Sequence, residues 1–336
     1  MIPDMLLFIA AVIGGLVVLV WSADQFVAGA AGLARALGIS TMIIGLTIVA
    51  FGTSAPEMLV SAMAASQDNS GLAVGNAVGS NIANMALVLG MTAAIAPLSV
   101  HSRTLSREFP LMLVVMAGAW GLLWNGVLSL LDGILLLSAM VGVILWTIHL
   151  ARTAGARDLL IEELVEEIPE AMAKSRAWWL LGSGLALLLA SSKLLVWGAV
   201  GVAEYYGVSD LVIGLTIVAI GTSLPELAAS VAAARKNEHD IAVGNVVGSN
   251  LFNILAVLGI AGSIGPGPVD PAVLYRDFPL MLALAVALYL MARGLNHSGH
   301  GLIKRWAGIA LLLVFVAYQV SLFLVVSSAA KGTTVT

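Results

Sequence analysis

The sequence has no cysteine and few charged residues. Only 10% of its 336 residues are Asp, Glu, Lys or Arg, whereas an average soluble domain has roughly 25%. The absence of cysteine excludes disulfides, thiolate metal sites and cysteine nucleophiles. The net charge of -4 is small and gives no basic footprint for nucleic acid. We therefore expect neither a nucleic-acid partner nor a soluble domain.

Long apolar stretches fill most of the chain instead. Hydrophobic residues make up 60% of the sequence, and the mean hydropathy is +1.04. About 20 apolar residues cross the roughly 30 Å hydrocarbon core of a bilayer. Windows of that length predict an all-α polytopic membrane protein, embedded in lipid, with ten transmembrane helices. These helices are expected near residues 5–36, 40–66, 71–97, 108–127, 130–150, 177–203, 209–235, 241–265, 277–293 and 304–328.

The two halves of the sequence repeat at a constant offset. GLTIVAFGTSAPE begins at residue 45 and GLTIVAIGTSLPE at residue 214, and 214 − 45 = 169. The same offset relates REFPLML at 107–113 to RDFPLML at 276–282. Five helices per repeat is an odd number, so the second half must enter the bilayer from the opposite side. Inverted repeats are typical of secondary transporters with a site near the bilayer midplane, although a duplication kept only for packing is the alternative.

This reading divides the chain into three parts. Residues 1–150 form the first five-helix repeat, with its motif at 45–90, and residues 177–336 form the second, with its motif at 214–259. Residues 151–176 form a charged cytoplasmic linker. Of the 15 Lys and Arg residues, Arg276 and Lys331 fall outside, Lys193 falls within a span, and the other twelve fall at cytoplasmic ends. This bias predicts that the N-terminus and the C-terminus both face outward.

A proline and a glutamate interrupt an apolar span in each repeat. Pro56 and Pro225 cannot donate a backbone hydrogen bond, so each predicts a kink and a carbonyl in need of a partner. Glu57 and Glu226 follow directly, and a carboxylate within a span is expensive and functional by default. Two hydroxyls precede each glutamate on the same helical face; they are Thr53 and Ser54, and Thr222 and Ser223.

The next span of each repeat carries a polar stripe of its own. Asn76, Ser80 and Asn84 stand at i, i+4 and i+8, as do Asn245, Ser249 and Asn253. They are candidates for the second wall of an oxygen cage, or for hydrogen bonds that only join helices. Glycines beside them predict close helix packing; these are Gly75, Gly79, Gly244 and Gly248. Hard oxygen ligands suit Ca²⁺ and Na⁺, and two carboxylates balance one divalent cation.

These motifs resemble a known family. GTSAPE and GTSLPE, followed by GNAVGSN and GNVVGSN, look like the two alpha-repeats of the calcium/cation antiporter superfamily, in its prokaryotic Na⁺/Ca²⁺ exchanger branch. The resemblance implies Ca²⁺ bound by Glu57 and Glu226, no cofactor, and location in a prokaryotic inner membrane. We expect the protein to be a monomer. It also implies Na⁺ sites and further ligands among Thr53, Ser54, Thr222, Ser223, Ser80, Ser249, Asn84, Asn253 and the carbonyls of Ala50 and Ala219.

The expected function is Na⁺/Ca²⁺ antiport that extrudes cytosolic Ca²⁺ by alternating access and is electrogenic. Potassium-dependent relatives carry an aspartate where this chain has Asn253, so we expect no K⁺ co-transport. Antiport of H⁺ for Ca²⁺, or of another divalent cation, is the main alternative, and a passive cation channel is a third. An enzyme is disfavoured because no nucleophile–base pair or metal triad is evident. Asp24 and Lys193 occupy equivalent positions and are not placed in the site.

Overall fold

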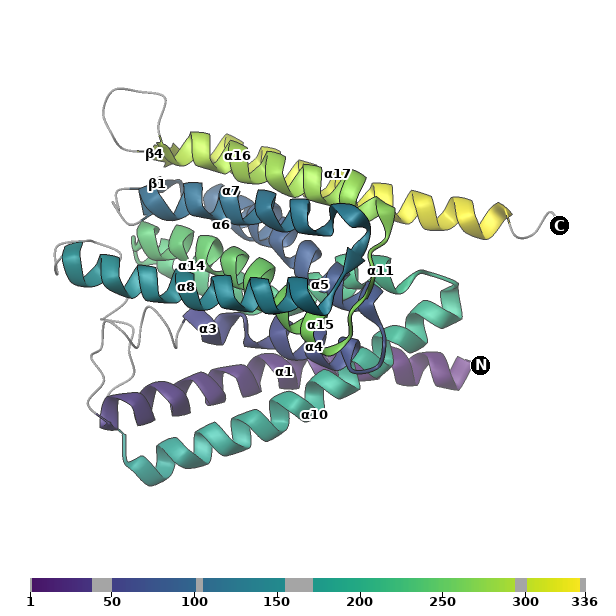
Figure 1. Ribbon diagram of the computed structural model, residues 1–336, viewed down its shortest axis with the longest axis horizontal. Helices are drawn as coiled ribbons and strands as arrows, with labels where there is room; N and C mark the ends of the chain where they lie inside the picture. Colours follow the sequence, from purple (N-terminus) through teal and green to yellow (C-terminus); the bar gives the residue numbers. More distant parts are fainter. Residues whose placement is uncertain (1, 38–49, 101–104, 155–171, 294–300, 333–336) are drawn as a thin grey trace.

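The structure is a computed structural model that describes residues 2–37, 50–100, 105–154, 172–293 and 301–332. Its helices lie side by side along the longest axis of the molecule (Figure 1). The first half contains α1 (Ile2–Ala36), α3 (Ala50–Thr53), α4 (Ala55–Ala65), α5 (Ser70–Ala83), the π-helix η2 (Asn84–Val88), α6 (Leu89–Ile95), β1 (Leu98–Val100), α7 (Leu105–Leu122), the 3₁₀-helix η3 (Leu123–Asn125), β2 (Val127–Leu128) and α8 (Leu130–Ala154).

The second half has a similar order of elements, with the additional π-helix η6 and without a 3₁₀-helix equivalent to η3 among the described residues. It contains α10 (Lys174–Tyr206), α11 (Asp210–Ile213), the π-helix η4 (Gly214–Val218), α12 (Ala219–Thr222), α13 (Leu224–Arg235), α14 (His239–Phe252), the π-helix η5 (Asn253–Val257), α15 (Leu258–Ile264), β3 (Gly267–Pro268), the π-helix η6 (Val273–Asp277), α16 (Phe278–Arg293), β4 (Gly301–Ile303) and α17 (Arg305–Gly332). Most of the predicted linker, residues 155–171, lies outside the described residues.

The described residues include eight helices that are long and apolar enough to cross a membrane. A ninth candidate is the pair Asp210–Thr222 and Leu224–Arg235, which is bent by 40° at its break. The predicted polytopic helical architecture is therefore confirmed. Of the span predicted at 40–66, residues 40–49 lie outside the described part of the chain, and α3 and α4 remain. The count of ten helices stays a prediction.

Two continuous runs of helix form the interior. In the apolar segment of Ser70–Ile95, 78% of the residues are buried, and in that of His239–Ile264, 83% are buried. In each of the other single spans, 50% or less of the apolar segment is buried. These runs are α5–η2–α6 and α14–η5–α15, the spans that carry the predicted asparagine stripes. The polar stripes therefore lie in the most enclosed part of the molecule.

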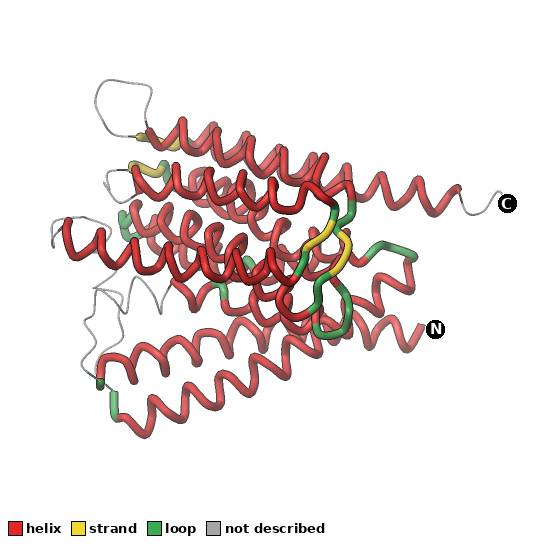
Figure 2. Tube along the Cα trace, in the orientation of Figure 1, coloured by secondary structure: helices red, strands yellow, loops and turns green. Residues whose placement is uncertain are grey.

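Four short strands depart from the all-α prediction. Strand β1 pairs antiparallel with β4, with Leu98 opposite Ile303, and β2 pairs antiparallel with β3, with Val127 opposite Pro268. Figure 2 shows the two pairs in yellow at opposite ends of the bundle. Each pair joins the first half of the chain to the second. Strands of two or three residues are too short to show an alternation of apolar and polar residues, so the sequence does not predict these pairings.

The α1 and α10 helices cross beside the rest of the bundle (Figure 1). A Cβ added at Gly29 would lie 2.8 Å from the carbonyl oxygen of Ala177. A Cβ added at Gly198 would lie 2.8 Å from the carbonyl oxygen of Phe8. Both pairs of positions are related by the offset of 169 residues. The two helices thus meet at two equivalent close contacts, where only glycine fits without a shift. Asp24 and Lys193, on the same helices, are exposed.

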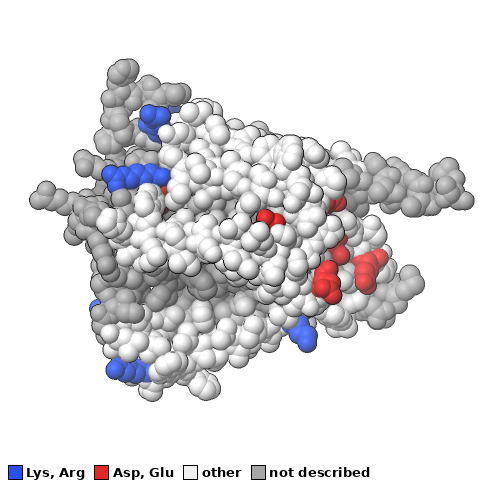
Figure 3. All heavy atoms as spheres, viewed as in Figure 1, with Lys and Arg blue, Asp and Glu red and all other residues white. Residues whose placement is uncertain are grey.

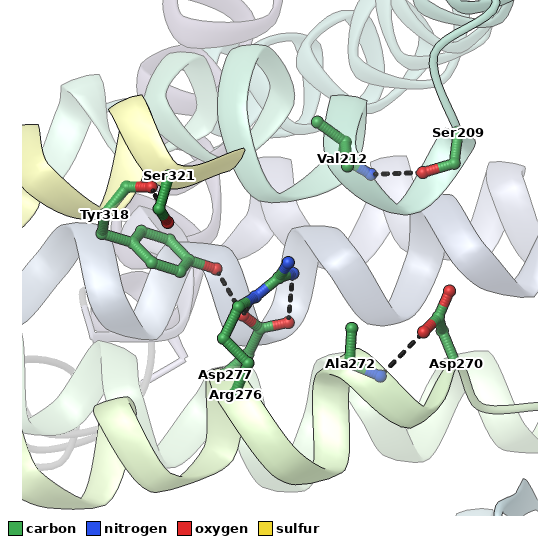
Figure 4. A network of polar contacts seen from close by, with 8 residues as sticks. All are labelled: Ser209, Val212, Asp270, Ala272, Arg276, Asp277, Tyr318 and Ser321. Atoms are coloured by element: carbon green, nitrogen blue, oxygen red, sulfur yellow. Dashed lines mark hydrogen bonds and ion pairs between the residues drawn. The ribbon is translucent and has the colours of Figure 1, made fainter. Parts of the chain in front are cut away.

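A buried carboxylate at the end of η6 joins that helix to α17. Asp277 is fully buried and accepts hydrogen bonds from Arg276 Nε at 2.7 Å and from the Tyr318 hydroxyl at 2.9 Å (Figure 4). A second guanidinium nitrogen of Arg276 donates to Asp277 at 3.0 Å. A buried charge needs such pairing to be tolerated. The side chain of Arg276, which we expect on the outer side of the membrane, is thus held in place by Asp277.

Candidate ion-binding site

The repeated Pro–Glu motifs lie at breaks between helices. Ser54 separates α3 from α4 with φ −90° and ψ 3°, and Ser223 separates α12 from α13 with φ −83° and ψ 4°. Pro56 and Pro225 lie in the first turn of the following helix. A backbone N–H is unpaired in a first turn in any case, so proline costs little there. The predicted interruption of both spans is therefore confirmed: each helix ends and restarts, and in the second repeat the two parts are bent by 40°.

The breaks place both glutamates at the start of a helix. Glu57 lies in the first turn of α4 and Glu226 in the first turn of α13, and both side chains are 0% exposed. The N-terminal end of a helix carries a partial positive charge that stabilises a carboxylate. A buried charge is tolerated only when it is paired. Two buried carboxylates, one from each repeat, therefore favour a cation.

Hydroxyl groups from the two halves meet beside these carboxylates. The Thr53 Oγ1 and Ser249 Oγ atoms are 3.3 Å apart, and the Ser80 Oγ and Thr222 Oγ1 atoms are 3.4 Å apart. Residues 53 and 222, and residues 80 and 249, are equivalent at the offset of 169. The Ser249 hydroxyl also donates to Glu226 Oε1 at 3.4 Å. The structure thus brings together predicted ligands from both repeats.

Six residues of the predicted ligand set have buried polar atoms without a hydrogen-bond partner among the described residues. Five residues outside that set also have such an atom; these are Asn81, Glu238, His239, Asn250 and Gln319. Both carboxylate oxygens of Glu57, one of Glu226, and the hydroxyl oxygens of Ser54 and Ser223 are in this state. So are both amide atoms of Asn84 and Asn253. Most buried polar groups in proteins are hydrogen-bonded. Half of the twelve predicted ligand residues are in this state, and unsatisfied buried oxygens are what a cation requires.

Asn84 and Asn253 begin matching π-helices. Helices η2 and η5 start at these residues and interrupt otherwise regular α-helix. The backbone N–H of Leu89, directly after η2, donates to the carbonyl oxygen of Asn84. The backbone N–H of Leu258, directly after η5, donates to that of Asn253. Single-turn π-helices occur frequently at functional sites because they shift the side chains of one turn. The irregular turn therefore coincides with the amide that each repeat offers to the site.

The other asparagines have a different role. Asn76 Nδ2 donates to the Glu57 carbonyl oxygen at 3.1 Å and to Ser61 Oγ at 2.9 Å. In the second repeat, Asn245 Nδ2 donates to the Glu226 carbonyl oxygen at 3.2 Å and to Ser230 Oγ at 3.0 Å. These amides join helices, which is the alternative that the sequence left open. They hold the backbone of each glutamate against the following span.

The sequence did not identify the two hydroxyls that accept these amide hydrogen bonds, those of Ser61 and Ser230. Ser61 Oγ donates to the Ala73 carbonyl oxygen at 3.2 Å, and Ser230 Oγ donates to that of Ala242 at 3.3 Å. Ser61 and Ser230 lie four residues after their glutamates and are themselves related by the offset of 169. That repetition of a lone hydroxyl in an apolar helix was a signal that could have identified them.

The remaining predictions for this region have mixed outcomes. The carbonyl oxygen of Ala219 already accepts the backbone N–H of Ser223 at 3.1 Å. Ala50 is the first residue of α3, directly after a stretch outside the described residues. A Cβ at Gly75 would lie 2.6 Å from the Leu211 carbonyl oxygen, as close packing requires. Among the described residues, nothing lies within 4 Å of a Cβ at Gly248. The predicted close packing is therefore confirmed at Gly75 and is not found at Gly248 in the described part of the chain.

Comparisons with known proteins agree with one another. The family model described as sodium/calcium exchanger protein matches residues 7–149 and 176–324. The chain is 50% identical over 312 residues to the putative antiporter CaxA of Alkalimonas amylolytica, covering 93% of this chain and 97% of that protein. It is 33% identical over 343 residues to the sodium/calcium exchanger MaX1 of Methanosarcina acetivorans, covering 92% and 96%.

A curated inner-membrane relative and a solved structure extend the likeness. The inner membrane protein YrbG of Escherichia coli strain K12 is 44% identical over 289 residues, covering 85% of this chain and 89% of that protein. The structure of the sodium-calcium exchanger NCX_Mj soaked with Na⁺ and Sr²⁺ aligns with a TM-score of 0.64 at 32% identity, covering 93% of this chain and 97% of that one. The relatives with assigned activities are transporters, not enzymes.

Proposed function

Since this chain belongs to the sodium/calcium exchanger protein family, we propose that it exchanges Na⁺ for Ca²⁺ by alternating access. Antiport itself follows from the family, and the choice of Na⁺ as the driving ion is our proposal. The observation that supports it most is the group of unpartnered oxygens on Ser54, Glu57 and Asn84 and on their three counterparts. Neutral hydroxyls and amides around two carboxylates can hold one divalent or several monovalent hard cations.

We assign the ligands by charge. Ca²⁺ lies between Glu57 and Glu226, because two carboxylates neutralise one divalent cation. Na⁺ needs fewer carboxylates and takes hydroxyl, amide and carbonyl oxygens beside them. Its proposed ligands are Thr53, Thr222, Ser54, Ser223, Ser80, Ser249, Asn84, Asn253 and the carbonyls of Ala50 and Ala219. The proposed ligands all come from one chain, so we expect a monomer to be sufficient.

We further propose ten spans in two inverted repeats, with both termini outside. Contacts that recur at the offset of 169 residues support the symmetry, both at the site and between α1 and α10. Figure 3 shows most of the visible Lys and Arg at one end of the molecule and most of the visible Asp and Glu toward the other. Both ends of the chain lie away from the basic end (Figure 1). Positive residues face the cytoplasm, so this polarity supports outward termini.

The proposed exchange moves net charge. If more than two Na⁺ ions replace each Ca²⁺, every cycle carries positive charge inward, worth about 2.3 kcal/mol per charge per 100 mV. Vesicles clamped with K⁺ and valinomycin measure this directly. Na⁺-driven Ca²⁺ flux should accelerate when the potential favours charge movement with Na⁺, and flux indifferent to potential would mean electroneutral exchange.

The driving ion is tested by substituting gradients. Ca²⁺ uptake into proteoliposomes should follow an outward Na⁺ gradient and should not follow an outward H⁺ gradient without Na⁺. Uptake driven by H⁺ alone would favour the alternative, H⁺/Ca²⁺ antiport. Because Asn253 offers a neutral amide rather than a carboxylate, replacing K⁺ by choline on both sides should leave the Na⁺-driven flux unchanged.

A further inference from the structure

An open apolar groove runs along the outer face of α13, beside the end of α6. Its volume is about 420 Å³, and its lining includes Met91 of α6 with Leu224, Leu227 and Val231 of α13. Ala228 and Ala232, at i and i+4 on α13, and Arg235 complete the lining. Ala228, Ala232 and Arg235 are all exposed. The groove therefore combines a hydrocarbon-lined channel with one positive charge.

The first repeat has no such combination of residues. The positions equivalent to Ala228 and Ala232 at the offset of 169 are Leu59 and Met63, whose larger side chains cover the same helical face. Both are partly buried against the core. The position equivalent to Arg235 is Ser66. At residues 228 and 232 the second repeat thus has small residues where the first has large ones, whereas at residues 224 and 231 it has Leu and Val where the first has alanines. The second repeat also has a cation where the first has a hydroxyl.

We propose that this groove binds one acyl chain of an anionic membrane phospholipid, with the phosphate of that lipid at Arg235. Each methylene buried against the lining contributes hydrophobic free energy. Arg235 lies in the last turn of α13, at the boundary of a candidate span, which is the depth of a headgroup. A basic residue there attracts anionic lipid.

The chemistry of the lining favours lipid over an ion. A cation would need oxygen ligands, whereas the residues that line the groove are apolar apart from one arginine, which repels cations. An acyl chain matches the apolar part, and only a headgroup phosphate satisfies the arginine at the same time. The groove also faces outward from a helix that is proposed to span the membrane, so phospholipid reaches it without passing through water.

The bound lipid lies next to the transport machinery. Leu224 lines the groove two residues before Glu226 on the same helix. A filled groove holds α13 against α6 and so restricts the helix that begins at the Ser223 break. Any effect of the lipid on exchange rests on the proposed function, whereas binding itself does not.

The experiment is native mass spectrometry of the purified full-length protein in detergent, titrated with phosphatidylglycerol or with phosphatidylcholine. The wild type should retain one phosphatidylglycerol more tightly than any further lipid. Arg235→Gln should weaken this first binding about fivefold and reduce the preference over phosphatidylcholine, as expected for one basic residue at the membrane surface. Ala232→Met, which introduces the residue of the first repeat, should abolish tight binding of both lipids.

Matched controls separate the groove from general effects. Arg176→Gln removes an exposed charge from the start of α10, away from the groove, and should bind phosphatidylglycerol like the wild type. Thermal unfolding verifies that Ala232→Met is folded, and Ala228→Leu provides a second blocked groove. Unchanged phosphatidylglycerol binding in both folded variants, or equal losses in Arg176→Gln and Arg235→Gln, overturns the inference. Neither result depends on whether the protein transports Na⁺.

Discussion

The hydroxyl oxygens of Ser80 and Thr222 lie 3.4 Å apart, although 142 residues separate them in the chain. Ser249 and Thr53 make the equivalent contact at 3.3 Å. Each contact joins the long central helix of one repeat to the helix break of the other. The two repeats therefore build one site together, and neither repeat contains it alone. Variants at equivalent positions should consequently have related but distinct effects.

Glu57→Gln and Glu226→Gln should each abolish most Ca²⁺ transport. The change preserves shape and removes half of the negative charge, which we expect to lower Ca²⁺ affinity about 30-fold or more, equivalent to ~2 kcal/mol. Tracer uptake into proteoliposomes measures the loss. Ca²⁺ raises the melting temperature of a protein that binds it when folded, so this shift should disappear in both variants.

The same variants have an informative effect on stability. Because both carboxylates are buried and have oxygens without hydrogen-bond partners, and an unpaired buried charge is costly, the ion-free protein should be at least as stable with glutamine at either position. A melting temperature well below that of the wild type without ions would mean that the glutamates hold the fold rather than the ion. Normal Ca²⁺ flux in either variant would remove both from the proposed site.

Ser54→Ala and Ser223→Ala should weaken Na⁺ dependence more than Ca²⁺ binding. A neutral hydroxyl matters most to an ion with few carboxylate ligands, and loss of one such ligand should raise the half-saturating Na⁺ concentration about tenfold, equivalent to ~1.4 kcal/mol. Ca²⁺ efflux is measured against external Na⁺. Ser183→Ala is the control, because that exposed hydroxyl bonds only within its own helix. Wild-type Na⁺ dependence in both site variants would place the Na⁺ sites elsewhere.

Asn76→Ala and Asn245→Ala should destabilise the protein by about 1–3 kcal/mol each, because buried partners lose their hydrogen bonds. Each amide holds the backbone of a glutamate to the following span. Thermal unfolding without ions reports the change, and Gln67→Ala at an exposed position should have almost no effect. If Asn76→Ala and Asn245→Ala have the same melting temperature as Gln67→Ala, these hydrogen bonds do not hold the helices in place.

Gly29→Ala should slow exchange severalfold and leave equilibrium Ca²⁺ binding intact. We propose that α1 and α10 slide against the other helices to switch access, and a Cβ at this position would lie 2.8 Å from the backbone of α10. The larger Gly29→Leu should slow exchange further. Gly14→Ala is the control on the same helix, since a Cβ there meets nothing within 4 Å. Equal flux in Gly29→Ala and Gly14→Ala would exclude this contact from the switching motion.

The sequence was sufficient to predict the main features because they depend on periodicity and charge. Apolar windows predict the helices, and the offset of 169 residues together with the buried glutamates predicts which side chains converge. What it could not predict depends on tertiary contact. A Pro–Glu pair is compatible with a kink or with a break, and only packing against the other repeat decides between them. The role of Asn76 could not be resolved either, because its partner Ser61 lies on another helix.

The strand pairs and the lipid groove show the same limit. Pairing of β1 with β4 joins residues about two hundred positions apart, and no local pattern encodes such a contact. The groove depends on how α13 and α6 are placed, although the exchange of Leu59 and Met63 for alanines is visible once the repeats are aligned. Repeat alignment therefore carries information on asymmetry as well as on symmetry.

The central claim is that Na⁺ and Ca²⁺ move in opposite directions through one shared site. The direct measurement is simultaneous efflux of radioactive Na⁺ and uptake of radioactive Ca²⁺ in the same proteoliposomes, loaded with Na⁺ and diluted into Na⁺-free medium. The account predicts that Ca²⁺ accumulates above its external concentration, that each flux stops when the other ion is withheld, and that Glu226→Gln stops both. Ca²⁺ entry that continues with equal Na⁺ on both sides, or Na⁺ efflux that ignores external Ca²⁺, would contradict it.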